Sequence, residues 1–354
     1  MTWELISTVQ NPWGQVPVSG HGQSVVPKVA EYMARVEEAA KRRNCVSRRH
    51  HYVPQAYMRA WSEDGKRVRV LDIRNGIDKL RGLRDTCVRE NFYQITTDGQ
   101  RHNQVEAMLA VIDDETARLL KFLRAWKPGD DMSFEDFMSL AVVLAFQRNR
   151  TPQVRRHLTD IDTWTRHRAN QVVPELTTNS FVQTLFRSTF GAADEHSTRQ
   201  LELWDDPGGR FITSDQPVQL SWDRPGETPS TINSEHLLWP ISPHRLVVLS
   251  QDLQGEKIVQ RTVSRKELDR IRGTFIRGAE TAIIALPHDG DLPSGKNLRK
   301  RPQLRTTCTP IDTEQRKCRI ELGWGYGAST LDETCQPLCA MKGQAPQSDD
   351  GQSV

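Results

Sequence analysis

The 354-residue sequence lacks the signatures of several large protein classes. It contains no run of about 18 apolar residues, so no membrane-spanning helix is expected. Residues 1–27 do not place an apolar stretch after a basic one, and we expect no secretory signal peptide. Neither a glycine-rich phosphate loop nor a Gly-x-Ser-x-Gly nucleophile motif occurs. The lack of a membrane span and of a signal peptide predicts a cytoplasmic protein with no membrane partner, whose six cysteines are reduced.

What is present is a polar but globular composition. Hydrophobic residues make up 36% and charged residues 26%, and the mean hydropathy of −0.62 is well short of a disordered chain. The net charge of +3 is too small to indicate nucleic-acid binding by itself. Positive charge is clustered in residues 41–49, 148–156 and 299–301, which fits either solvated surface or contacts with anions.

Composition divides the chain into three parts. Residues 1–27 are rich in Gly, Pro, Ser and Gln and are expected to be a flexible leader, whereas residues 290–354 are expected to be a mostly irregular tail. Between them, residues 28–289 are predicted to form a single α+β core domain. Four cysteines of the tail have spacings that match no common zinc ribbon or finger, and zinc binding there is an alternative to free thiols. They are Cys308, Cys318, Cys335 and Cys339.

Hydrophobic periodicity predicts helices in the centre of the chain and strands on both sides. The expected helices span 29–43, 103–126, 133–149, 152–170, 179–189 and 264–277, with Ser133 and Ser264 as N-caps. The expected strands span 67–73, 91–96, 201–204, 210–213, 218–222, 237–240, 245–250 and 281–286, with turns at Asn75-Gly76 and Gly208-Gly209. This order is typical of an α+β fold, a central helical bundle packed with short, mostly antiparallel strands.

The first candidate motif is the run from His50 to Pro54. Adjacent histidines cannot share one face of a helix or strand, so at most one of His50 and His51 points into a site. Pro54 favours an extended residue before it and permits a helix from Gln55 onward. A histidine in this position could be a general acid or base or a metal ligand. The alternative is a capping or hydrogen-bonded structural histidine.

The second motif is a pair of carboxylates on the long helix expected at 103–126. Glu106 and Asp113 are seven residues apart, which places them on one face, two turns from each other. Ala110 and Ala117 lie on the same strip and leave room for a ligand to approach. Such a pair suits a divalent metal or an ion pair with arginine. The alternative is a solvated helix face.

The third motif, from Gln147 to Pro152, follows the apolar stripe of another helix. Gln147 extends that stripe, so an amide lies on a face that should be apolar and must be paired if buried. Arg148 and Arg150 lie at the break between two helices, where arginines suit the recognition of carboxylates or phosphates. The alternative is a buried ion pair with Glu106 or Asp113 that holds two helices together.

The fourth motif is the Thr213–Pro217 corner, where a strand is expected to end. Asp215 at such a position suits a catalytic carboxylate. An aspartate in the same position is equally typical of an Asx-turn, in which the carboxylate binds nearby backbone N–H groups. The sequence leaves both readings open.

These motifs together resemble the domain of unknown function 4238 family, whose hallmark is a His-Tyr-Val-Pro motif, here residues 51–54. The resemblance covers roughly residues 47–288. The sequence departs from the family pattern with Asp113 in place of glutamate and Gln216 in place of asparagine. The family supplies residues to test rather than a reaction. The other shared positions are Glu106, Arg150-Thr151-Pro152 and Thr213-Ser214-Asp215.

Two classes of function fit these residues. The first is a hydrolase, in particular a metal-dependent nuclease or another phosphodiesterase acting on nucleic acid or a phosphorylated ligand. Catalysis is then assigned to His51, Asp215 and Arg150. Binding is assigned to Arg148, Gln147 and His50, and a divalent metal such as Mg²⁺ or Mn²⁺ to Glu106 and Asp113. The second is a non-catalytic module that binds or senses an anionic ligand in a bacterial conflict or regulatory system, with the same residues forming a structural network.

Overall fold

The computed structural model describes residues 7–11, 14–18, 27–43, 47–168, 176–221, 234–293, 303–312 and 317–325. The chain divides into two compact units. The first comprises Met1–Arg155 and Thr177–Arg299, and the second comprises Arg156–Leu176 and Lys300–Val354. The candidate site residues all lie in the first unit.

The predicted helices form close to their expected bounds, except that the one expected at 179–189 continues to residue 196. The helices are α1 (Pro27–Lys41), α2 (Gln55–Met58), α3 (Gln104–Ala125), α4 (Phe134–Asn149), α5 (Pro152–Arg168), α6 (Thr178–His196) and α7 (Arg265–Gly278). Short 3₁₀ turns follow at Arg59–Trp61 and Leu83–Asp85. Ser133 caps α4 by accepting from the N–H of Asp136 at 3.1 Å. Ser264 and Glu267 form a complete capping box at the start of α7.

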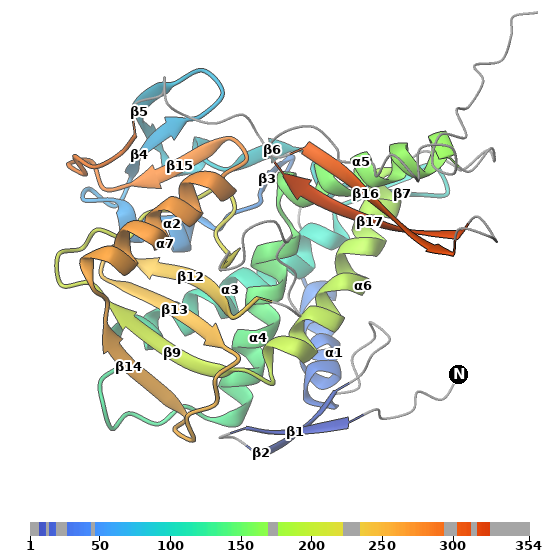
Figure 1. The fold of residues 1–354 in the computed structure, drawn as a ribbon. Helices are drawn as coiled ribbons and strands as arrows, with labels where there is room; N and C mark the ends of the chain where they lie inside the picture. The colour runs from blue at the N-terminus through green and yellow to red at the C-terminus, as the bar shows by residue number, and fades with distance from the viewer. Residues whose placement is uncertain are drawn as a thin grey trace, which may run out of the picture. The chain divides into compact units, whose positions relative to one another are not determined.

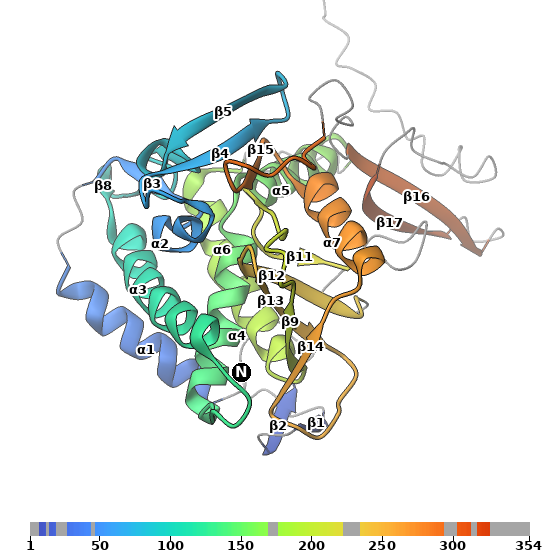
Figure 2. The same ribbon diagram turned by 90° about the vertical axis from the view of Figure 1, so that its left-hand side faces the viewer.

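A five-stranded sheet forms the centre of the first unit. Its order is β11 (Gln219–Leu220), β12 (His236–Ser242), β13 (Arg245–Ser250), β9 (Gln200–Asp205) and β14 (Ile258–Thr262). The β14 strand runs parallel to β9, and the other pairs are antiparallel. Figures 1 and 2 show α7 on one side of this sheet and helices α3 and α4 on the other.

Both faces of this sheet are apolar and buried. On one face Leu246 and Val248 pack with Phe275 of α7 in a common core cluster. On the other face the Trp239 ring stacks on Tyr57, with centroids 5.7 Å apart and planes within 4°. A sheet covered on both sides has near-continuous apolar strands, which is why β12 and β13 read as hydrophobic runs.

A second sheet joins segments that are far apart in the chain. Its order is β10 (Thr213–Ser214), β15 (Ala282–Ala285), β4 (Arg67–Asp72) and β5 (Ile77–Gly82), all antiparallel. Two-stranded ladders join β3 (Arg49–His51) to β6 (Val88–Glu90) and β7 (Ile95–Thr97) to β8 (Gln100–His102).

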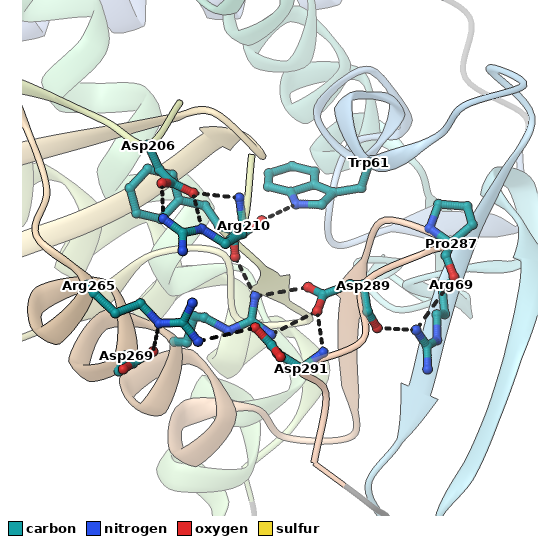
Figure 3. A network of polar contacts seen from close by, with 11 residues as sticks. Trp61, Arg69, Asp206, Arg210, Arg265, Asp269, Pro287, Asp289 and Asp291 are labelled. Atoms are coloured by element: carbon teal, nitrogen blue, oxygen red, sulfur yellow. Dashed lines mark hydrogen bonds and ion pairs between the residues drawn. The ribbon is translucent and has the colours of Figure 1, made fainter. Parts of the chain in front are cut away.

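A polar network fastens α7 to both sheets (Figure 3). The buried guanidinium of Arg272 contacts both carboxylate oxygens of Asp289, at 2.9 and 3.1 Å, and donates to the carbonyl of Arg210. The Arg210 guanidinium in turn donates to Asp206 at 2.6 and 3.0 Å. Arg69 of β4 donates to the Asp289 carbonyl. The network therefore links the loop after β9, the helix α7 and the second sheet.

Hairpins occur in segments that the sequence predicted to be irregular. In the region expected to be a leader, β1 (Ser7–Asn11) pairs with β2 (Gly14–Val18). In the second unit, β16 (Gln303–Asp312) pairs with β17 (Lys317–Gly325) in the region expected to be an irregular tail. Strand propensity of the β-branched residues within these segments outweighed their many Gly and Pro neighbours. Cys308 and Cys318 lie on the second hairpin, and Cys335 and Cys339 lie outside the described residues.

The α+β class is confirmed, but two expected strand features are wrong. The strand expected at 91–96 is mostly a turn, because Asn91 adopts a left-handed backbone conformation. The expected hairpin around Gly208-Gly209 does not form. The strand before it pairs with β13 and β14, whereas β10 after it joins β15 of the second sheet. Among the helices that the structure describes, none is both long and apolar enough to cross a bilayer.

Candidate functional site

The site begins at the ladder between β3 and β6, where His50 is fully buried. Both of its ring nitrogens have partners. The N–H of Tyr93 donates to Nδ1 at 3.1 Å, and Nε2 lies 3.0 Å from the carbonyl oxygen of Ser47, to which it donates. The ring also stacks on Tyr93 with planes within 5°. Burial lowers the pKa of His50 against the effect of the Ser47 bond, so the ring is neutral and serves the structure.

An unusual backbone positions Tyr93. Cys87 and Asn91 flank β6 with φ values of 54° and 52°, in the left-handed region that non-glycine residues rarely adopt. The sharp turn at Asn91 allows the Tyr93 hydroxyl to donate to the carbonyl oxygen of Arg150 at 2.5 Å. The β6 segment is thereby fastened to the end of α4.

Two helices supply the charged groups of the site. Glu106 and Asp113 lie two turns apart on α3, and Arg150 immediately follows α4. The Arg150 Nη2 atom lies 2.7 Å from Oδ1 of Asp113, and the His50 Nδ1 atom lies 3.9 Å from Oε2 of Glu106. The Arg150 side chain is 0% exposed, whereas Asp113 is 28% and Glu106 18% exposed. The guanidinium is therefore enclosed, whereas the side chains of the two carboxylates are partly exposed.

Several polar atoms of this cluster have no hydrogen-bond partner among the described residues. They are Nε and Nη1 of Arg150, both amide atoms of Gln147, and Oε2 of Glu106, whereas Nη2 of Arg150 is engaged by Asp113. Nearly all buried polar groups in proteins are hydrogen-bonded, and leaving one unpaired costs about 1–3 kcal/mol. Gln147 precedes Arg150 by one helical turn, so both side chains lie on one side of α4. Their unpaired atoms indicate a place for a ligand that accepts hydrogen bonds.

The electrostatics of the cluster bring the pKa of Glu106 close to neutral pH. Burial, together with the negative charge of Asp113, raises the pKa of Glu106 to about 7 against the charge of Arg150. Burial also raises the pKa of Asp113, and the Arg150 charge opposes it. Burial lowers the pKa of Arg150, but the charge of Asp113 outweighs it and the net pKa is raised. Arg150 therefore stays charged while Glu106 can hold or release a proton.

His51 adjoins this cluster from the opposite side of β3. Its Nε2 atom is buried and has no partner among the described residues. Burial lowers the pKa of His51, hydrogen bonds to the backbone at Leu83 and Arg84 oppose this, and the positive charge of Arg150 lowers it further. A neutral imidazole with a free nitrogen can accept a proton. The two histidines thus lie on opposite sides of β3, with His50 fully buried and His51 half-buried.

Arg148 points away from the cluster. Burial lowers the pKa of its guanidinium to about 10, Glu195 raises it, and Arg199 lowers it further, which places Arg148 beside the end of α6. Its carbonyl oxygen accepts from the Gln216 side chain at 3.0 Å. The Arg148 side chain, to which a binding role was assigned, therefore lies in a different environment from that of Arg150.

Asp215 is fully buried and engaged by the backbone. Its carboxylate accepts from the N–H groups of Glu280 and Thr281 at 2.9 and 2.7 Å and from the Thr281 hydroxyl at 2.5 Å. Burial nevertheless raises its pKa above the usual value. Beside it, Gln216 accepts from the Thr151 hydroxyl. This corner joins β10 to β15 and to the start of α5, which is the structural reading of the fourth motif.

A comparison with sequence models of protein families assigns this part of the chain to a family. The model described as "Protein of unknown function (DUF4238)" matches residues 49–289. The chain belongs to the DUF4238 family. The matched residues contain the whole cluster from His50 to Asp215, so the site is a property of the DUF4238 region. No match was found among curated proteins or among solved structures.

The metal assigned to this DUF4238 site stays a prediction. Among the residues that the structure describes, no group of three or more His, Cys, Asp or Glu side chains could hold a metal ion. The cation beside Asp113 is the guanidinium of Arg150. Glu106 and Asp113 alone provide two of the six or more oxygen ligands that Mg²⁺ requires, so water or substrate would have to supply the others.

Sequence reasoning missed one important member of the DUF4238 site. Tyr93 binds His50 through its backbone and Arg150 through its hydroxyl, yet it sits in a segment that reads as an ordinary strand. The only available signal was an aromatic residue with a polar group next to another aromatic, Phe92. Such a tyrosine usually finds a hydrogen-bond partner when buried, but the sequence does not say which.

Proposed function

We propose that this protein is a hydrolase that cleaves phosphodiesters, with Arg150 binding the anionic group and Glu106 donating a proton. The observation that carries the proposal is the coexistence of two features within one cluster. Arg150 is fully buried and paired with Asp113 through Nη2 only, its Nε and Nη1 having no hydrogen-bond partner among the described residues, and the pKa of Glu106 is raised to about 7. An acidic group with a raised pKa next to an incompletely paired cation is typical of catalytic sites.

The charge balance supports a protonated Glu106 in the active form. The Arg150–Asp113 pair has no net charge, so an ionised Glu106 makes the cluster negative and repels a phosphodiester anion. A protonated Glu106 leaves the cluster neutral and offers a donor to the leaving oxygen. The Arg150 guanidinium then donates to the non-bridging oxygens, where negative charge develops in the transition state.

His51 completes a balanced hydrolysis. A water molecule attacks the phosphorus, and its proton passes to Nε2 of His51, which is neutral and unpaired. The bond from phosphorus to the leaving oxygen breaks, and that oxygen takes the proton of Glu106. The chain ends with a protonated imidazole and an ionised carboxylate, which exchange protons with solvent. His50 and Asp215 hold the backbone around these groups and take no part in the proton transfers.

The proposal includes nucleic acid or a phosphorylated ligand as partner and a cytoplasmic setting. Within the basic segment 148–156, Arg150 is the residue that supports an anionic substrate, since Arg155 donates to the Phe92 carbonyl and to the Thr178 hydroxyl. A divalent metal such as Mg²⁺ or Mn²⁺ would further neutralise the phosphate when bound beside the two carboxylates.

The test measures hydrolysis of bis(p-nitrophenyl) phosphate and of single-stranded RNA and DNA, each with and without Mg²⁺ or Mn²⁺. The wild type should hydrolyse one of these substrates at a rate that falls as the pH rises through about 7, because Glu106 then loses its proton. Glu106→Gln should lose activity at every pH. Activity in Glu106→Gln equal to that of the wild type would refute the proposal.

One observation favours a second candidate, a module that binds an anion without reacting with it. Of the three residues assigned to catalysis, Asp215 is fully occupied by backbone and hydroxyl donors. A binder would retain the interaction of phosphate with Arg150 and show no turnover by the wild type. Binding of a phosphodiester that is lost in Arg150→Met, together with no hydrolysis under any condition, would select this candidate.

A further inference from the structure

A cavity lies away from the Arg150 cluster, between α7 and the five-stranded sheet. Its volume is about 570 Å³, within the range of about 300–1,000 Å³ that small-molecule sites occupy. The floor is apolar and well ordered by packing, since Trp204, Leu238 and Ile271 are each no more than 6% exposed. An apolar floor with polar groups around it is the usual form of a ligand site.

The aromatic side of the cavity is preorganised. The Arg261 guanidinium lies over the Trp204 ring, 3.7 Å from its centroid, and the His236 ring meets Trp204 edge to face with centroids 5.3 Å apart. Arg261 is held there by an ion pair with Glu267 at 2.9 Å. A planar heterocycle entering the cavity would meet two flat groups on which it can stack, the His236 ring and the Arg261 guanidinium that covers Trp204.

The helical side of the cavity is cationic. Arg270, Thr274 and Arg277 lie at positions i, i+4 and i+7 of α7, so they form one stripe that faces the cavity. Arg270 is exposed and makes no ion pair with any described residue, whereas the Arg277 guanidinium lies close against Gly273. Two guanidinium groups on one stripe suit a phosphate group, whereas the Thr274 hydroxyl between them already donates to the Arg270 carbonyl oxygen at 3.1 Å.

The remaining charges of the cavity indicate a ligand that carries other polar groups besides a phosphate. With the Arg261–Glu267 pair set aside, the cavity is lined by the two guanidiniums of α7 and one carboxylate, that of Glu235. A carboxylate repels a bare phosphate but accepts hydrogen bonds from the hydroxyls of a ribose. Stacking surfaces, cations and one exposed acid therefore correspond to the three parts of a mononucleotide.

We propose that this cavity binds a nucleoside monophosphate, with the base against His236 and Arg261 and the phosphate on Arg270 and Arg277. The two sites lie on different elements, because the Arg150 cluster is built from β3, α3 and α4. A nucleotide bound at α7 can therefore act as an effector or as a second recognition point, whatever reaction the Arg150 cluster performs.

The experiment is isothermal titration calorimetry of the full chain with AMP, GMP, CMP and UMP, and with adenosine and inorganic phosphate as partial ligands. At least one mononucleotide should bind more tightly than either partial ligand. Arg270→Ala should weaken that binding about tenfold or more, since a hydrogen bond to a charged group contributes about 1.5–3 kcal/mol. Arg270 is exposed, and circular dichroism should show the variant folded.

Arg265→Ala is the matched control, because Arg265 is an exposed arginine of the same helix whose partners are Asp269 and Asp291. It should bind the mononucleotide as the wild type does, and so should Arg150→Met, which tests the other site. No mononucleotide binding at millimolar concentration would overturn the proposal. Equal weakening in Arg265→Ala and Arg270→Ala would do the same, because only general charge attraction would then be at work.

Discussion

Two buried arginines in the first unit are satisfied to very different degrees. Arg272 on α7 contacts both oxygens of Asp289 and donates to the Arg210 carbonyl, so its guanidinium is well occupied. Arg150 after α4 has one close contact, from Nη2 to Asp113, and two nitrogens, Nε and Nη1, without a hydrogen bond to any described residue. Their acidic partners also differ, since the Asp289 side chain is 10% exposed and that of Asp113 is 28% exposed.

This difference distinguishes the structural ion pair of Arg272 from the candidate ligand-binding site at Arg150. A buried charge is tolerated when its hydrogen bonds are complete, and the cost of desolvation is then offset by the contacts it makes. For an incompletely paired guanidinium, the protein's own contacts offset less of the desolvation cost. Such a group is expected where a ligand supplies the missing hydrogen bonds. The contrast predicts opposite results when each arginine is removed.

The largest effect is expected from Arg272→Met. The substitution leaves the buried Asp289 carboxylate without its cation, and breaking such a pair costs about 3–5 kcal/mol. Urea denaturation should show the free energy of unfolding reduced by that amount. Phosphodiester hydrolysis by the fraction that remains folded should be unchanged. A reduction below about 1 kcal/mol would mean that the polar network of Figure 3 does not stabilise the fold.

Arg150→Met should have the reverse profile. Loss of one preorganised donor to a developing charge lowers turnover about 100-fold or more. The free energy of unfolding should change by about 1 kcal/mol or less, because the partly exposed Asp113 can be hydrated once it is unpaired. Rate measurements and urea denaturation on the same preparation check both statements. Large destabilisation with activity retained per folded molecule would remove the distinction between the two arginines.

Glu106 gives the site a pH signature of its own. Its folded pKa of about 7 lies above the usual value of 4.5, so the folded state binds the proton more tightly. The resulting stabilisation is complete below about pH 4.5 and is lost as the pH rises through about 7. At 1.36 kcal/mol per pKa unit it amounts to about 3 kcal/mol. Glu106→Gln should remove this component from a series of denaturation curves, and an unchanged pH dependence would contradict it.

The smallest effect is expected from His50→Ala, which tests whether a residue inside the site can be purely structural. The change leaves the Tyr93 N–H and the Ser47 carbonyl without their partner, at a cost of about 2 kcal/mol. The dependence of the hydrolysis rate on pH should keep its shape, because His50 transfers no proton. A shifted pH profile at constant stability would instead assign His50 a chemical role.

The predictable parts of the fold were those specified by neighbouring residues. The capping box of Ser264 and Glu267 fixed the start of α7, and Ser133 fixed that of α4. Periodicity predicted α3, and with it the common face of Glu106 and Asp113. The turn at Gly76 and the strands on either side were likewise local, since a positive φ at that glycine closes the hairpin.

The parts that could not be predicted depend on distant segments. Nothing near Gly208-Gly209 shows that β10 leaves its neighbour to pair with β15. The sequence also left open whether Asp215 is catalytic or structural, and that depends on the N–H groups of residues 280 and 281. The ion pair of Arg150 with Asp113 was foreseen only as one of two alternatives, because helix periodicity does not determine which helix faces meet.

The pairing of β4 with β15 also determines when this protein can fold. Leu71 lies opposite Ile283, so the second sheet cannot close until almost the whole matched region has left the ribosome. Until then β4 and β5 form a hairpin with an open edge, and the apolar face of β4 has no cover. Such late closure slows folding and exposes nascent chains to aggregation, so we expect the yield of native protein to depend on chaperones more than its size suggests.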